Sequence, residues 1–200
     1  MNSQIRTLTA LLGLSAVTTF LVAFFVCSAM TPNFSVANDF ISKLGSRGQP
    51  YADWWNAIGF GSVGLMVAFF GFLFGITVED RLLGLCLFVA GLAFAFAAFP
   101  TDLLDANSTL SKVHYASICF ALAGWCLGLA RLMGSRSKNR FARTTATYTI
   151  CLSLLPMIAM SGGISAEPVA HRLVLLAVFA WVTANCLRLL KTETNAGITG

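Results

Sequence analysis

The sequence predicts an all-α membrane protein, a bundle of six transmembrane helices. Apolar residues make up 57% of the 200-residue chain and charged residues only 10%, whereas a soluble domain carries about 25% charged residues. Six stretches are apolar over roughly the 20 residues that a helix needs to cross a bilayer core. They cover residues 8–30, 57–78, 82–99, 113–133, 144–161 and 169–190. This composition excludes a secreted disulfide scaffold, a disordered chain and an ordinary cytosolic enzyme.

The first span is predicted to be a retained helix rather than a secretory signal. Only Arg6 precedes it as a basic residue, its apolar run is longer than the core of a signal peptide, and Ser28-Ala29-Met30 is a poor cleavage site. In all six spans the apolar runs are continuous and lack two-residue alternation, which indicates helices rather than barrel strands. The third and fifth spans are short, so neighbouring helices or a thinner bilayer must accommodate them.

The basic residues predict the orientation, because cytoplasmic segments carry an excess of Lys and Arg. Nine of the 13 basic residues fall on one side of a six-span arrangement: Arg6, Arg81, Arg131, Arg136, Lys138, Arg140, Arg143, Arg188 and Lys191. Both termini are therefore expected in the cytoplasm, with one six-helix domain over residues 1–192 and a short cytoplasmic tail at 193–200. The basic balance reflects topology and anionic lipid headgroups, so the expected partners are membrane lipids and not nucleic acid.

Small residues on the second span predict close helix packing. Gly71 and Gly75 are four residues apart, and Gly59, Gly61 and Gly64 crowd the start of the same span. Small side chains let helix backbones approach each other where no hydrophobic effect drives association. Within one chain we expect this spacing to serve packing between its own helices rather than dimerisation. The oligomeric state itself does not follow from the sequence.

The loop at residues 31–56 lies on the outer side and mixes polar with large apolar residues. That pattern is typical of a short interfacial helix that lies on the membrane or covers the bundle. Gly45 is expected to end this helix in the left-handed conformation that glycine accepts. Trp54 and Trp55 are predicted to be an interfacial anchor. Asn56 follows at the mouth of the second span, where its amide needs hydrogen-bond partners.

Ionisable residues gather around the second outer loop. Pro100 disfavours helical conformation at the residue before it, which places Asp102 just beyond the third span. Asp102 and Asp105 are spaced to face one another across one turn. Ser111 is predicted to cap the fourth span, which puts His114 in the first helical turn. The positive end of the helix there favours neutral imidazole, the form that binds metals or accepts protons.

His171 and Arg172 begin the sixth span at an equivalent depth. Ionisable groups at membrane depth are candidates for function, because burying them alone costs several kcal/mol. Asp102 needs a strong donor, and we expect an arginine rather than either outer lysine, because lysine can extend into water while the planar guanidinium suits a carboxylate. The prediction is an Asp102–Arg172 pair, with His114 hydrogen-bonded nearby.

Several of these residues occur in an order that resembles one family. The run from Asn38-Asp39-Phe40-Ile41-Ser42-Lys43-Leu44-Gly45 is followed by Asn56 in front of a glycine-rich helix, by Phe99-Pro100-Thr101-Asp102, and by His114 and Arg172. Over nearly its whole length the chain resembles the bacterial and archaeal membrane proteins grouped as domain-of-unknown-function family 998. That group is thought to be distantly similar to six-helix proteins of lipid or GPI-anchor remodelling.

The resemblance implies a six-helix membrane fold and a bacterial inner (plasma) membrane, but no established activity. It also implies a set of signature positions: Ser42, Gly45, Asn56, Asp102, His114 and Arg172. His171 stands where glutamine is expected in that family, which weakens any scheme that needs two histidines.

The first functional hypothesis is a protein that binds or modifies a lipid or lipid-linked headgroup at the outer leaflet, with its enzymatic status, metal and cofactor left open. Asp102 and His114 would supply general acid–base catalysis or bind a metal, and Ser42 would act as a nucleophile or hydrogen-bond donor. No G-x-S-x-G or H-E-x-x-H motif accompanies them.

Three further residues would bind the ligand in this hypothesis. Asn56 would orient it, Arg172 would bind a phosphate or carboxylate, and Asp105 would provide an additional acid. These residues, together with the three that would do the chemistry, are then expected to converge at the outer end of the bundle. In the structural alternative the same cluster only fastens the loops to the helices.

Two other functions stay open from the sequence. His114 and His171 have similar depth and would serve as axial ligands of a b-type haem, which an absorption spectrum would reveal. Six helices would also line a path for passive movement of a small neutral solute. Proton-coupled transport is disfavoured, because no charged residue lies near the middle of a span.

Overall fold

The computed structural model is all helical, and no strand occurs among the residues that it describes, 3–105, 107–135, 139–163 and 166–198. Its six long helices are α1 (Ser3–Met30), α3 (Val63–Thr77), α4 (Arg81–Phe96), α5 (Thr109–Gly134), α6 (Arg140–Ser161) and α7 (Glu167–Ile198). The all-helical prediction is confirmed. Arg136, Lys138 and the last two residues of the predicted tail lie outside the described residues.

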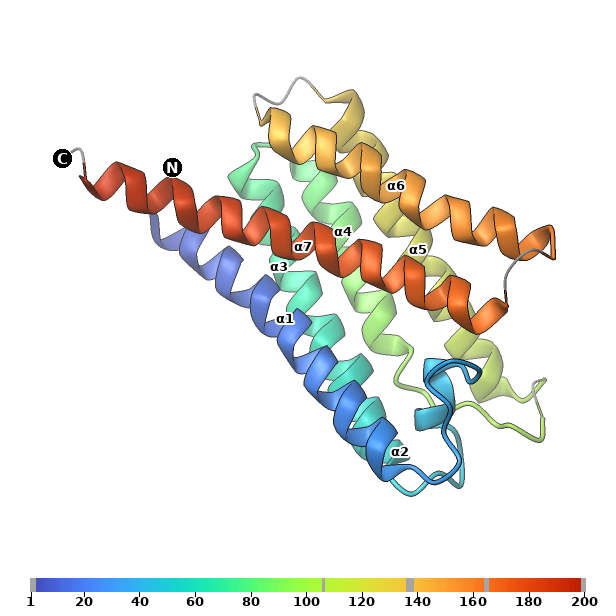
Figure 1. Cartoon of the computed structure of the whole chain (residues 1–200). Helices are drawn as coiled ribbons and strands as arrows, with labels where there is room; N and C mark the ends of the chain where they lie inside the picture. Colours follow the sequence, from blue (N-terminus) through green and yellow to red (C-terminus); the bar gives the residue numbers. More distant parts are fainter. Residues whose placement is uncertain (1–2, 106, 136–138, 164–165, 199–200) are drawn as a thin grey trace.

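The six long helices form a closed ring. Each packs against the next long helix along the chain, and α7 completes the ring by packing against α1. Figure 1 shows both termini at one end of the bundle, and residues 31–56 and 97–108 together at the opposite end. These ends are called the termini end and the loop end below.

Five helical segments are long and apolar enough to cross a membrane: α1, the continuous run Ala52–Thr77, α5, α6 and residues 167–191 of α7. Helix α4 is apolar but has only 16 residues. The outward faces carry large apolar side chains such as Phe25, Phe120 and Ile158, which are 62%, 69% and 65% exposed. Contiguous exposure of this kind suits lipid rather than water. The chain is therefore a multi-pass membrane protein.

Aromatic side chains fill the middle of the ring. Trp181 of α7 packs edge-on against Trp125 of α5 and Phe74 of α3, with ring centroids 5.4 and 5.2 Å apart. Phe20 of α1 packs against Phe179 of α7 at 4.8 Å. Edge-to-face aromatic pairs add roughly 0.5–1.5 kcal/mol to the burial of their area. Helices on opposite sides of the ring are thus held together by their side chains.

Helices α3 and α4 approach each other closely through glycines. A Cβ atom built on Gly75 would lie 2.4 Å from the Cα atom of Gly84, and one built on Gly71 would lie 2.5 Å from Cβ of Leu87. A Cβ atom on Gly64 would lie 2.3 Å from the backbone nitrogen of Ala95. The expectation that this spacing serves packing within the chain is confirmed.

The short helix predicted in residues 31–56 is the 3₁₀-helix η1 (Ile41–Gly45). The expected left-handed cap is wrong, because Gly45 is not among the glycines with positive φ, Gly48 and Gly163. Glycine is needed there for a different reason. A Cβ atom on Gly45 would lie 1.9 Å from Oδ1 of Asn56, so only glycine leaves room for that side chain.

A wide helical turn leads from the loop end into α3. The α2 turn (Ala52–Trp54) continues as the π-helix η2 (Trp55–Ser62), which runs without a break into α3. The hydroxyl of Ser62 donates to the carbonyl of Ala57 at 3.0 Å, five residues back. π-Helical turns are rare and are often found at functional sites. This one sets the direction of Asn56 and Phe60, both buried at the loop end.

Candidate functional site

Buried hydrogen bonds join the two loops at the loop end. Asn56 Nδ2 donates to the carbonyl of Gly45 at 2.9 Å, and the hydroxyls of Ser46 and Thr101 are 2.7 Å apart. The backbone N–H of Arg47 donates to the carbonyl of Thr101 at 2.9 Å. Asn56, Ser46 and Thr101 are all buried. We call these five residues the loop clasp, since they fix residues 45–47 against the chain that leaves α4.

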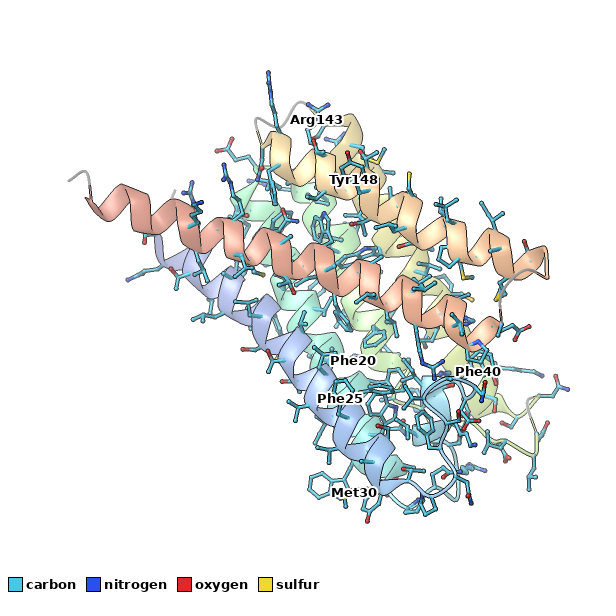
Figure 2. The ribbon with its side chains drawn as sticks, viewed as in Figure 1. Phe20, Phe25, Met30, Phe40, Arg143 and Tyr148 are labelled. Carbon is cyan, nitrogen blue, oxygen red and sulfur yellow. The ribbon has the colours of Figure 1, made fainter. Side chains whose placement is uncertain are left out.

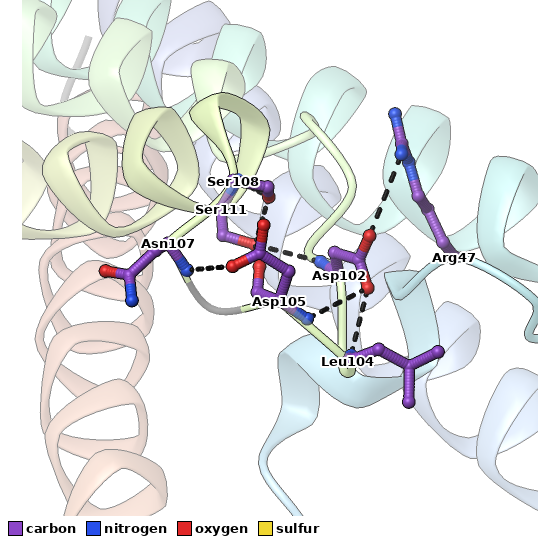
Figure 3. Close-up of polar contacts among 7 residues, drawn as sticks. All are labelled: Arg47, Asp102, Leu104, Asp105, Asn107, Ser108 and Ser111. Carbon is purple, nitrogen blue, oxygen red and sulfur yellow. Dashed lines mark hydrogen bonds and ion pairs between the residues drawn. The ribbon is translucent and has the colours of Figure 1, made fainter.

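Asp102 uses much of its hydrogen-bonding capacity within its own loop (Figure 3). Its Oδ1 accepts from the backbone N–H groups of Leu104 at 2.9 Å and Asp105 at 3.2 Å. Its own N–H donates to Oγ of Ser111 at 2.9 Å. Its Oδ2 lies 3.7 Å from Nη1 of Arg47, an ion-pair distance rather than a hydrogen bond. The carboxylate therefore shapes the turn and faces Arg47.

The predicted Asp102–Arg172 pair is wrong. Nη2 of Arg172 donates to the backbone carbonyl of Asp39, and the Asp39 carboxylate pairs with Lys43 at 2.8 Å. The hydrogen bonds of the loop clasp hold Arg47, not Arg172, beside Asp102. The two outer arginines thus bind different segments: Arg172 of α7 contacts the residues before η1, whereas Arg47 contacts the loop after α4.

His114 is buried, with 3% of its surface exposed, and binds the end of α4. Its Nδ1 lies 2.6 Å from the carbonyl oxygen of Ala97 and 3.2 Å from that of Phe99. A carbonyl oxygen can only accept, so Nδ1 carries the proton and Nε2 is the nitrogen left for other partners in the neutral ring. The ring also packs edge-on against Phe60, with centroids 5.4 Å apart. His114 thereby connects α5, α4 and η2.

The N-cap of α5 is Ser108, not Ser111 as predicted. The backbone N–H of Ser111 donates to Oγ of Ser108 at 3.2 Å, and α5 begins at Thr109. The two serines are three positions apart, and either could accept from a first-turn amide. The chain turns into the helix earlier than predicted, so His114 lies in the second turn rather than the first.

Ser42 and Asp105 make only local contacts. The carbonyl of Ser42, rather than its hydroxyl, accepts from Oγ of Ser46 at 3.1 Å. Asp105 is exposed, and its Oδ1 accepts from the backbone N–H of Asn107 at 2.9 Å. The nucleophilic role of Ser42 and the acidic role of Asp105 stay predictions.

His171 lies apart from His114. Its Nδ1 is 2.8 Å from the carbonyl of Glu167, and its ring packs edge-on against Phe40 with centroids 5.3 Å apart. No ring contact or hydrogen bond joins the two histidines in the described part of the chain. Nor do three His, Cys, Asp or Glu side chains gather there as metal ligands. The haem hypothesis stays a prediction.

The structure brings Asn56, Asp102 and His114 together at the loop end through their contacts with the two outer loops. Arg172 joins the same end from α7. Each of these residues also makes a structural contact, and the chemical roles predicted for them stay predictions. Sequence reasoning missed Arg47, although the signal was available: it is an arginine in the loop at residues 31–56, on the same side as Asp102.

A hollow of about 390 Å³ opens beside the loop clasp, lined by residues 47–50, 52–54 and Pro100. Arg47 and Asp53 bring opposite charges to it, and Trp54 stands at its edge with 68% of its surface exposed. The Arg47 side chain is 57% exposed. The hollow is therefore open, polar and bordered by an aromatic ring.

The Asp39 carboxylate predicts a pH dependence of stability. Lys43 Nζ donates to it at 2.8 Å and the Ser35 N–H at 2.7 Å, and these contacts hold the pKa of the Asp39 carboxyl below its ordinary value of 3.8. A depressed folded-state pKa gives stability that is complete above the unfolded pKa and is lost as pH falls through the folded one.

We therefore expect the thermal midpoint of the wild type to fall more steeply than that of Asp39→Asn between about pH 5 and about pH 2, since the variant has no carboxyl to protonate there. Circular dichroism in a non-ionic detergent would measure both midpoints. Parallel slopes for the two proteins would contradict the prediction.

Comparison with known families places the chain in one of them. Residues 14–188 match the family described as "Protein of unknown function (DUF998)". No curated protein and no solved structure matches the chain. The match runs from the middle of α1 almost to the end of the membrane-crossing part of α7, and so includes the loop clasp and every predicted site residue. The chain therefore belongs to this family of membrane proteins.

Proposed function

We propose that this protein binds the headgroup of a zwitterionic phospholipid in the hollow at the loop end. The observation that carries the proposal is the composition of that hollow, in which Arg47 and Asp53 stand with the exposed Trp54. A zwitterionic headgroup presents a phosphate and an ammonium group a few bonds apart. Arg47 would bind the phosphate, because guanidinium donors match phosphate oxygens, and Asp53 would accept from the ammonium group.

The size and the edge of the hollow support this assignment. Its volume of about 390 Å³ suits a small ligand. Tryptophan is enriched where a membrane meets water, and an exposed indole beside a hollow at that level would also attract the ammonium group. The Arg47 guanidinium is 3.7 Å from Asp102, beyond hydrogen-bonding distance, so its donors are available to a ligand.

The proposal is binding rather than catalysis. The loop clasp would fix the backbone on one side of the hollow, which gives Asn56 a positioning role through Gly45. Asp102 and His114, the predicted acid–base pair, already contact backbone groups of the loop after α4. Modification of the bound headgroup would need one of them to release these contacts.

The proposal includes a topology. All six long helices would cross the membrane, with the loop end outside and both termini in the cytoplasm, as the distribution of basic residues indicates. The 16 residues of α4 rise about 24 Å. That is shorter than a bilayer core of about 30 Å, so tilt of its neighbours or local thinning would accommodate α4.

Titration with dioctanoyl phosphatidylethanolamine, followed by tryptophan fluorescence in a non-ionic detergent, tests the proposal. We expect saturable binding to the wild type. Arg47→Gln and Asp53→Asn should each raise the apparent Kd by about tenfold, because a hydrogen bond to a charged group contributes roughly 1.5–3 kcal/mol. The matched control is Lys112→Gln, which removes an exposed cation of α5 at the same end but outside the hollow.

Dioctanoyl phosphatidylcholine provides the second arm. Its quaternary ammonium has no N–H to donate, so it should bind more weakly than phosphatidylethanolamine, and Asp53→Asn should reduce that difference. Equal Kd values for the wild type and both hollow variants would contradict the proposal, as would an equal loss in Lys112→Gln.

A further inference from the structure

A second hollow lies at the termini end, where α5 ends and α6 begins. It has a volume of about 310 Å³ and is lined by Met133, Arg140, Arg143, Thr144 and Thr147. Four of these residues come from the first two turns of α6, at the spacing i, i+3, i+4 and i+7 that places side chains on one face of a helix. The hollow is thus built by one basic and hydroxylated face.

No ion pair among the described residues neutralises the charge of this hollow. The ion pairs among the described residues are Lys43–Asp39, Arg47–Asp102 and Arg131–Asp80, and none of them includes Arg140 or Arg143. The reason is visible in the sequence, which has no Asp or Glu between Asp105 and Glu167. Two arginines thus share one hollow without a carboxylate partner among the described residues, and this concentration of positive charge favours an anion from outside the chain.

The polar groups around the hollow suit a phosphate. Arg143 is half-buried, and its Nε is shielded from solvent and has no hydrogen-bond partner. The side chain of Asn139 caps α6 by accepting from the N–H of Ala142 at 3.1 Å, so the positive end of the helix dipole lies at the same place. The exposed Thr144 adds a hydroxyl that can donate to a phosphate oxygen.

The surroundings indicate that the phosphate belongs to a lipid. Figure 2 shows Arg143 near the start of α6 and Tyr148 farther along the same helix. Tyr148 and Leu152 are 65% and 56% exposed on the outside of α6, and Met133 adds an apolar side chain to the hollow. A headgroup in the hollow would have its acyl chains beside this apolar surface. Basic pockets between transmembrane helices are known to take anionic lipid headgroups.

We propose that the Arg140–Arg143 hollow is a binding site for the phosphodiester headgroup of an anionic phospholipid in the leaflet at the termini end. The site is independent of the hollow at the loop end, because it lies at the opposite end of the bundle and selects negative charge rather than a zwitterion. Its occupation would fix the start of α6 against the end of α5, which are joined through residues 135–139.

Thermal unfolding of the purified protein in a non-ionic detergent, titrated with dioctanoyl phosphatidylglycerol, tests this site. The lipid should raise the unfolding midpoint of the wild type saturably, because a ligand that binds only the folded state stabilises it. The double variant Arg140→Gln/Arg143→Gln should raise the apparent Kd by about thirtyfold, since each arginine near an anionic headgroup increases the affinity by roughly a factor of five. Arg140→Gln alone replaces an exposed side chain that has no ion-pair partner among the described residues. It should raise the apparent Kd by about fivefold.

Arg81→Gln is the matched control. Arg81 is an exposed arginine at the first position of α4, at the same end but outside the hollow, so its removal should change the Kd by less than about twofold at physiological salt. Any shift with dioctanoyl phosphatidylcholine comes from the hollow at the loop end, so it should be the same in the wild type and in Arg140→Gln/Arg143→Gln. An equal shift with sodium phosphate would assign the site to a free anion and overturn the lipid assignment. Unchanged binding in Arg140→Gln, or an equal loss in Arg81→Gln, would overturn the site itself.

Discussion

Replacing Gly91 by alanine is expected to separate α3 from α4 and to destabilise the protein by about 3 kcal/mol, the upper part of the range for an overpacked core. A Cβ atom at this position would lie 2.2 Å from the backbone nitrogen of Ala68 and 2.5 Å from its Cα. Backbone atoms of a packed helix cannot rotate away as a flexible side chain can. The helices must therefore move apart, which also loosens the contacts at Gly71 and Gly75.

The same substitution at Gly134 provides the control. Gly134 is the last residue of α5, and nothing lies within 4 Å of a Cβ atom built there. Gly134→Ala should change stability by no more than about 0.5 kcal/mol, as expected for a surface position. Denaturation by titrated sodium dodecyl sulfate, followed by circular dichroism, measures both variants. A Gly91→Ala protein as stable as Gly134→Ala would mean that α3 and α4 do not pack through this glycine.

Replacing Asp80 by alanine is expected to cost about 2 kcal/mol, because this carboxylate both caps a helix and binds a second one. Its Oδ1 accepts from the N–H of Leu83 at 3.1 Å at the start of α4, and its Oδ2 lies 2.9 Å from Nε of Arg131 in α5. Asp80 is 8% exposed while the Arg131 side chain is 49% exposed, so solvent weakens the ion pair and the helix cap supplies at least half of the loss.

Asp80→Asn separates the two contributions. Asparagine caps a helix about as well as aspartate but carries no charge, so its loss should be about 1 kcal/mol. Arg131→Gln should then add little to Asp80→Asn, because the pair is already broken. Glu79→Gln, which neutralises the exposed neighbouring carboxylate, should be near neutral. Full additivity of Asp80→Asn and Arg131→Gln would contradict the coupling.

The positions of the helices can be predicted from the sequence, because lipid offers the backbone N–H and C=O groups no hydrogen-bond partner. A backbone N–H or C=O in the bilayer core must bond within its own segment, so a long apolar run is a helix whatever surrounds it. The spans near 113–133 and 144–161 correspond to α5 and α6, with borders shifted by a few residues at their polar ends. The glycine spacing on α3 also predicted packing within the chain correctly, because a missing side chain has the same consequence for any neighbour.

The partners of the polar residues did not follow from the sequence. Arg172 was expected to bind Asp102, but Arg47 faces that carboxylate, at an ion-pair distance of 3.7 Å. Ser108 caps α5 in place of Ser111, although both have the same hydroxyl. Gly45 was needed for its lack of a side chain beside Asn56 rather than for its conformation. In each case the sequence indicated the kind of residue that the position needs, but not which residue it contacts.

The sequence by itself determined that this chain is a helical membrane protein with its ionisable residues near the ends of its spans, because burial of apolar surface and satisfaction of the backbone are properties of each segment alone. Only the tertiary structure decided which side chains meet. Closure of the ring brings α7 to the segment before η1 and brings the loop after α4 to Arg47, and it sets α5 beside Asp80 from 51 residues away. Such contacts depend on the positions of several helices at once, and no local pattern of residues records them.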